Sequence, residues 1–241
     1  MAIWRLGTGQ TEPDSIAEVL TEEKMVVGSR GGNAIVQDVL FGATSYLAAS
    51  ADRIYLASSE AYSIQVLDRR GRLTRITRRA VTPKDVQQDH IRRYVEQLLA
   101  ATDEGAERLE ELTQRMADGP VAEVMPAYRL VLVDACGNLW VEDWDDVGVR
   151  QGAFSVFGPD GVWLGRVTLP PGLPWTRGLK FTMEIGEDYI LGTWIADFGV
   201  EQVRLYRIDK GRSDPSALCP SESAPVPSSP ELGQKGGTGR L

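Results

Sequence analysis

Hydrophobic and polar residues alternate in nine short runs between residues 53 and 209. The runs are rich in Val, Leu, Ile and aromatic residues, and most are separated by Gly, Pro, Asn or Asp. Alternation over this length is typical of antiparallel strands. We therefore expect strands at residues 53–58, 62–68, 72–78, 128–134, 138–143, 153–158, 162–169, 189–195 and 203–209.

Three pairs of these runs are joined by four-residue turns that end in glycine. The turns are residues 68–71 (DRRG), 134–137 (DACG) and 158–161 (GPDG). Asp or Pro early and Gly in fourth place is the composition of a type I turn followed by a residue in the left-handed region. Glycine enters that region without a Cβ penalty, so backbone geometry alone explains these three glycines.

The order of the runs also repeats. A strand, a loop of variable length, an aromatic-containing strand, a glycine turn and a polar strand that often carries arginine follow one another. A repeated four-stranded meander favours β-propeller blades over a two-sheet sandwich. We therefore expect an all-β fold of four-stranded antiparallel blades that form a partial ring of about three to four.

Residues 82–118 interrupt the strands and predict a short helical insertion. Thr82, Pro83 and Asp85 resemble an N-cap, a first-turn proline and an acidic N3 residue. Two helices are expected, interrupted near Gly105 and ended near Gly119. A separate helical domain is the weaker alternative, because about 35 residues barely suffice for an independent core.

The composition changes again near residue 213. Residues 213–241 are rich in Pro, Ser and Gly and contain few large apolar residues, which predicts a disordered tail. The domain expected is therefore a partial propeller over residues 1–212, with the helical insertion at 82–118, followed by this tail.

The segment from Asp134 through Gly137 to Val141, with the sequence DACGNLWV, carries a family resemblance. It resembles the D-x-x-G-N-L-W-V signature of NHL-repeat and related six-bladed propellers. The segment around Asp68 and the last predicted strands are similar to blades of bacterial members of that group, so the resemblance covers about residues 40–210.

The resemblance implies a propeller scaffold but no single function, since such scaffolds carry binding, hydrolytic and scaffolding roles. A closed propeller usually has four to eight blades. We therefore expect this chain to be the C-terminal part of a longer protein. The alternatives are that it closes by association or that its first 40 residues contribute further strands.

Charge and hydropathy narrow the classes of partner that we expect. The formal net charge is -8, which argues against a general affinity for nucleic acid and other acidic partners. No window approaches 18 apolar residues, so no membrane span is expected. Residues 1–15 lack the charged and apolar regions of a secretory signal, and the compartment stays open, although the resemblance implies that full-length relatives are exported.

Candidate catalytic and metal groups are few. The acidic stretch from Glu142 to Asp146 offers carboxylates to Ca²⁺, but it lacks the EF-hand spacing and is more often merely solvated. His90, the single histidine, lies on a predicted helix without a G-x-S-x-G motif elsewhere. Cys136 and Cys219 are 83 positions apart and leave the disulfide question open. We expect no catalytic residues, no metal ligands and no cofactor.

Arginine and tryptophan supply the candidate binding residues. Six arginines lie between residues 69 and 79, where they either protect an edge strand or bind an anionic ligand. Most tryptophans of the C-terminal half are expected to pack between blades. Trp175 is the exception, because its proline-bounded loop is expected at a propeller rim. The candidate binding residues are Arg70, Arg72, Arg75, Trp144 and Trp175.

These patterns favour a non-enzymatic binding or interaction module that recognises a protein, peptide or glycan at the propeller rim. The alternative is a lactonase- or lyase-like propeller enzyme with a metal on the central axis. The resemblance implies Glu, Asn and Asp ligands for such a metal, but the chain contains only Asn33 and Asn138, and neither matches a ligand position.

Overall fold

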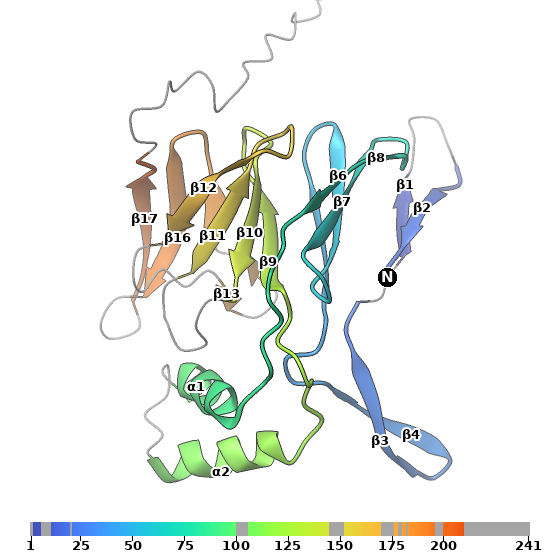
Figure 1. Ribbon diagram of the computed structural model, residues 1–241, viewed down its shortest axis with the longest axis vertical. Coiled ribbons are helices and arrows are strands. Elements are labelled where there is room, and N and C mark those ends of the chain that lie inside the picture. The colour runs from blue at the N-terminus through green and yellow to red at the C-terminus, as the bar shows by residue number, and fades with distance from the viewer. Residues whose placement is uncertain are drawn as a thin grey trace, which may run out of the picture.

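The computed structural model describes residues 2–5, 11–19, 21–99, 106–144, 152–169, 176–177, 180–181, 183–195 and 200–209. It is mostly β, with antiparallel pairing throughout the named strands. Two helices lie below the sheets in Figure 1. The expected all-β class is confirmed at this level. No helix in the described part of the chain is long and apolar enough to cross a membrane.

The first four-stranded sheet is a simple meander in which each strand pairs with the next. Its order is β5-β6-β7-β8. The register places Tyr55 opposite Val66 and Leu56 opposite Gln65. The first pair therefore lies on one face of the sheet and the second pair on the other. The strands are β5 (Ser45–Ala49), β6 (Arg53–Ser58), β7 (Ser63–Asp68) and β8 (Leu73–Arg78).

The second four-stranded sheet repeats this meander in the order β9-β10-β11-β12. Its third strand is buried along its whole length, because both faces of the sheet are covered. The strands are β9 (Tyr128–Val133), β10 (Leu139–Asp143), β11 (Ala153–Phe157) and β12 (Trp163–Thr168).

A third sheet has three described strands in the order β15-β16-β17, and a two-stranded ribbon precedes it. The third-sheet strands are β15 (Met183–Ile185), β16 (Tyr189–Ile195) and β17 (Glu201–Arg207), and the ribbon is β13 (Thr176–Arg177) with β14 (Lys180–Phe181). The outer strand β17 exposes Val203 and Leu205.

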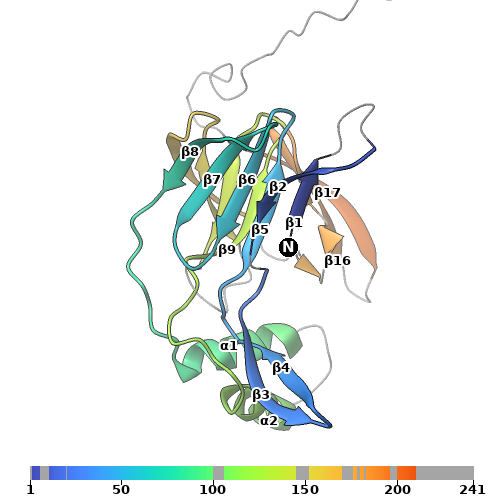
Figure 2. The ribbon, with the colours of Figure 1, turned by 90° about the vertical axis from the view of Figure 1, so that its right-hand side faces the viewer.

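The first 40 residues form two hairpins, so they do contribute strands. The first is β1 (Ala2–Arg5) with β2 (Asp14–Glu18), and the second is β3 (Lys24–Arg30) with β4 (Asn33–Asp38). Every residue of β3 and β4 is exposed, and Figure 2 shows this hairpin projecting beside the helices.

The core lies between the stacked sheets, which stand side by side in Figure 1. One cluster joins the first sheet to the second through residues such as Tyr55, Ile64 and Tyr128. Another joins the second sheet to the third through Trp140, Phe154 and their neighbours. Burying a large apolar side chain contributes about 1.5–3 kcal/mol, so these two interfaces hold the sheets together. The described sheets do not close into a ring.

The three predicted glycine turns have the predicted backbone geometry. Gly71, Gly137 and Gly161 have φ values of +78°, +78° and +87°. In each turn an aspartate side chain accepts hydrogen bonds from backbone amides: Asp68 from Arg70 and Arg72, Asp134 from Cys136 and Asn138, and Asp160 from Val162. The aspartates therefore fix the turns that the glycines make sterically accessible.

The helices are α1 (Gln88–Leu99) and α2 (Ala106–Ala117), so the predicted start near Thr82 is wrong. Residues 84–86 instead pair with residues 123–125: the amide of Val86 donates to the carbonyl of Glu123, and the amide of Met125 donates to that of Lys84. At the observed start, the amide of Gln87 donates to Nδ1 of His90. Tertiary backbone pairing thus overrides the local capping pattern.

Two further expectations have different outcomes. Trp140 is buried between sheets as expected, whereas Trp163 is 58% exposed because it lies on β12, the edge strand of the second sheet. The predicted tail at 213–241 and the side chain of Trp194 lie outside the described residues.

Candidate functional site

A cavity lies where the first and second sheets meet two connecting segments. It has a volume of about 790 Å³ and is lined by the β6–β7 turn, by residues 78–84 after β8, by residues 124–127 before β9 and by the end of β10. We call it cavity 1. Volumes of about 300–1,000 Å³ are usual for ligand sites in proteins.

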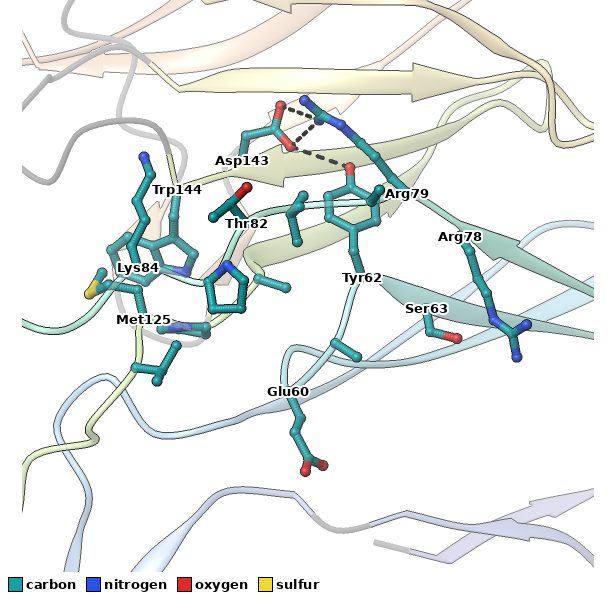
Figure 3. Close-up of a pocket in the computed structure, with 17 residues that line it drawn as sticks. Glu60, Tyr62, Ser63, Arg78, Arg79, Thr82, Lys84, Met125, Asp143 and Trp144 are labelled. Atoms are coloured by element: carbon teal, nitrogen blue, oxygen red, sulfur yellow. Dashed lines mark hydrogen bonds and ion pairs between the residues drawn. The ribbon is translucent and has the colours of Figure 1, made fainter.

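The inner wall of cavity 1 is a hydrogen-bonded group around Asp143. Nη1 of Arg79 lies 2.9 and 3.0 Å from the two carboxylate oxygens of Asp143 and 2.6 Å from Oγ of Ser155. The Ser155 hydroxyl donates to Asp143 at 2.7 Å, and the Tyr62 hydroxyl donates to it at 3.3 Å. The dashed lines in Figure 3 mark the contacts of Asp143 with Arg79 and Tyr62. This group links both sheets at the end nearest the helices.

The acid–base state of this wall follows from burial. Burial raises the pKa of Tyr62, and the nearby carboxylate of Asp143 raises it further. The phenol therefore stays protonated and remains a donor to Asp143. The guanidinium of Arg79 forms an ion pair with Asp143 in this wall. Arg79 is therefore not available as a free cation for a ligand.

The other cations of cavity 1 are Arg78 and Lys84. Within the described part of the chain, neither side chain forms an ion pair, and both residues are exposed. In Figure 3, Lys84 and Trp144 are seen on the opposite side of the view from Arg78. Among the described lining residues, Glu60 is the one acidic residue apart from Asp143.

A smaller cavity of about 420 Å³ adjoins the first, and we call it cavity 2. Trp144 and Pro126 line both cavities. Cavity 2 is aromatic: Phe41 packs edge-on to Tyr94 and to Trp144, at centroid distances of 5.6 and 5.8 Å. It therefore offers an apolar space beside the charged one.

The side chains of Arg129 and Glu142 lie close together behind Trp144. Nε of Arg129 is 3.6 Å from Oε2 of Glu142, and the Arg129 guanidinium lies 4.9 Å from the centroid of the Trp144 ring. Glu142 is 1% exposed. Burial raises the pKa of Glu142 to about 8, although Arg129 acts in the opposite direction. Oε2 of Glu142 and Nε1 of Trp144 are buried and have no hydrogen-bond partner among the residues that the structure describes.

The structure separates the candidate residues that the sequence grouped. Trp144 lines both cavities, whereas Arg70 and Arg72 lie at the β7–β8 turn, at the other end of the first sheet. Arg75 donates a 2.7 Å hydrogen bond to the Pro159 carbonyl and so joins the first two sheets. Trp175 lies outside the described residues.

Sequence reasoning named Arg79 and Asp143 without pairing them. Arg79 stood among the arginine set, and Asp143 stood in the acidic stretch considered for Ca²⁺. In the structure they neutralise each other across 64 sequence positions. The sequence did hold a signal for this pairing, because an arginine at the end of a predicted strand and an aspartate at the end of a strand in the next meander have opposite charges.

Among the described residues there is no group of three or more His, Cys, Asp or Glu side chains that could hold a metal ion. Asp145 and Asp146 of the acidic stretch lie outside the described residues. The arrangement around cavity 1 is suited to holding a charged ligand by its side chains and exposed backbone.

Comparison with known proteins gives no family assignment. No protein-family model matches the chain, and no curated protein matches it.

Proposed function

We propose that this chain is a non-enzymatic binding module of the β-propeller type, similar to NHL-like six-bladed proteins, and that cavity 1 holds an anionic ligand. Three features support the propeller assignment. The sheets are meanders in chain order, they stack face to face, and the hairpins β7–β8, β9–β10 and β11–β12 are closed by Asp-x-x-Gly or Pro-Asp-Gly turns. The contact between β5 and β9, the first strands of successive sheets, fits two neighbouring blades.

The observation that carries the ligand assignment is that two cations on the wall of a ligand-sized cavity, Arg78 and Lys84, form no ion pair with any residue that the structure describes. The chain as a whole has a net charge of -8, so two neighbouring cations of one cavity without acidic partners among the described residues form a local basic region on an acidic protein. Charges beyond about 8 Å are largely screened at physiological salt, so a bound anion responds mainly to these neighbours. An acidic protein, peptide or glycan is the ligand class that fits.

The test uses fluorescence polarisation of fluorescein-labelled hexaglutamate and hexalysine with the full chain at 50 and 300 mM NaCl. Hexaglutamate should bind more tightly than hexalysine, and more weakly at the higher salt concentration. The double variant R78Q/K84Q should weaken hexaglutamate binding by about tenfold, which corresponds to about 1.4 kcal/mol.

The matched control is R70Q/R72Q, which removes the same charge at the opposite end of the first sheet. It should leave hexaglutamate binding unchanged. Equal weakening by both double variants would show that only net charge matters and would overturn the proposal.

A further inference from the structure

We infer that the ligand is an extended acidic peptide that pairs with the backbone of residues 80–82 and places a neighbouring apolar side chain in cavity 2. This inference rests on the proposed function, because it names the ligand class for the same site. Its three supports are a row of free amides, the local charge, and the position of cavity 2.

The free amides lie in the segment that leaves β8. β8 is the edge strand of the first sheet, and the chain continues from it along cavity 1. Ala80, Val81 and Thr82 are exposed, and within the described residues their amides donate no hydrogen bond. Such a row beside an edge strand is a template for an added strand.

Side-chain charge sets the composition of that strand. Arg78 and Lys84 lie on either side of the free amides along the chain. Arg79 separates Arg78 from these amides, and Pro83 separates them from Lys84. Side chains at alternate positions of a bound strand point the same way, so two acidic residues separated by one position would face this wall together. Cation–carboxylate contacts then add to the backbone pairing.

Cavity 2 gives the peptide an apolar anchor. It shares Trp144 and Pro126 with cavity 1, so a side chain next to the acidic residues has an adjoining space to enter. Phe41, Tyr94 and Met116 supply apolar surface there, and Asp38 is the one carboxylate in its lining. An aromatic or aliphatic residue matches this lining better than a further acid.

The probe is the labelled peptide Gly-Ser-Phe-Ser-Glu-Ser-Glu-Ser-Gly, compared with its reversed sequence and with the same peptide carrying Ser in place of Phe. The tighter of the two Phe peptides should bind at least about tenfold better than the Ser peptide, because linking two contacts raises the effective concentration of the second. Met116→Gln should remove most of that gain and leave the Ser peptide unaffected.

Backbone pairing is tested on the peptide, so the fold of the protein is not disturbed. Two versions carry N-methyl groups on alternate residues, one on the odd positions and one on the even positions. An added strand turns alternate amides toward its partner, so one version should lose at least about tenfold in affinity while the other binds like the parent peptide.

The outcomes distinguish a failure of this peptide-binding mode from a failure of the proposed function. If both N-methylated peptides bind like the parent, strand pairing is overturned, and if Phe gives no gain in either orientation, the anchor is overturned. In both cases binding that is sensitive to R78Q/K84Q still upholds the anionic site. If no acidic peptide binds the full chain, the proposed function itself fails.

Discussion

The indole nitrogen of Trp140 donates a 2.8 Å hydrogen bond to the carboxylate of Asp134, six residues earlier in the same hairpin. Asp134 also accepts from the amides of Cys136 and Asn138 and from the side chain of Asn138. Asp134 and Trp140 are both buried. One carboxylate therefore fixes the β9–β10 turn and holds a core indole of the second interface.

Replacing this carboxylate should destabilise the protein strongly. Asp134→Ala leaves several buried donors without an acceptor, and we expect a loss of about 3–5 kcal/mol in the free energy of unfolding measured in urea. Asp160→Ala is the control, because Asp160 is the third residue of a glycine turn, is exposed and accepts one amide. Its cost should be about 1 kcal/mol, and equal costs would contradict the role of burial.

The turn glycines should differ in their tolerance of alanine. Gly137→Ala should lower the free energy of unfolding by about 1–2 kcal/mol, which is the cost of a left-handed backbone for alanine. No steric cost is added, because the nearest atom to the new Cβ would be in Pro159, at 3.8 Å. Gly161→Ala should cost more, since its Cβ would lie 2.9 Å from Nε of Arg75. Gly28→Ala, with open space and no positive φ, is the control. Thermal unfolding of the three variants checks the order, and a Gly28 variant as unstable as the others would contradict it.

The contact between Arg79 and Asp143 should couple the first two sheets. In a double-mutant cycle with Arg79→Gln and Asp143→Asn, we expect a coupling free energy of about 1–3 kcal/mol, because the Asp143 side chain is only 8% exposed. The exposed pair Lys24 and Asp38 is the control and should give about 0–1 kcal/mol. A coupling at Arg79 no larger than in that pair would show that the contact does not hold the sheets together.

Stability should fall as the pH rises from about 5 to about 8, because the pKa of Glu142 is raised from 4.5 to about 8 by burial. In this range the folded state keeps a proton that the unfolded state has released, so the free energy of unfolding decreases by up to about 1.4 kcal/mol per pH unit. Below about pH 4.5 both states are protonated and this effect is absent. Arg129, which attracts the charged form, and Asp143, which opposes it, are the charged groups acting on Glu142.

Glu142→Gln should flatten this dependence in urea titrations across pH 5–9. The variant should match the parent near pH 5 and be more stable near pH 8.5. Glu60→Gln, at an exposed position, should leave the pH profile of the parent unchanged. A Glu142 variant whose stability still falls with pH like the parent would contradict the buried, proton-holding carboxyl.

Each of the nine runs expected between residues 53 and 209 overlaps a strand, because alternation and turn glycines are local signals, but the short strands β13, β14 and β15 in the same range were missed. The run at residues 53–58 matches β6, and the run at 189–195 matches β16, at both ends. The hairpin β3–β4 was missed although Gly31 and Gly32 mark its turn, because its exposed strands lack a clear apolar face.

The site was less predictable, because its contacts join distant segments. Trp144 was identified as a candidate, but the cavity beside it depends on residues 78–84 meeting residues 124–127. The pairing of residues 84–86 with 123–125 is a long-range contact that no local pattern displays. Arginine density led to Arg70 and Arg72, whereas the cations that line cavity 1 include Arg78 and Lys84.

Hydrogen–deuterium exchange of the full chain with and without hexaglutamate tests the central claim most directly, because it locates the bound anion. Ligand in cavity 1 should slow exchange at the free amides of Ala80, Val81 and Thr82 and leave the β7–β8 turn around Arg70 and Arg72 unchanged. Slower exchange at that turn, with no change at residues 80–82, would contradict the assignment of cavity 1 as the binding site.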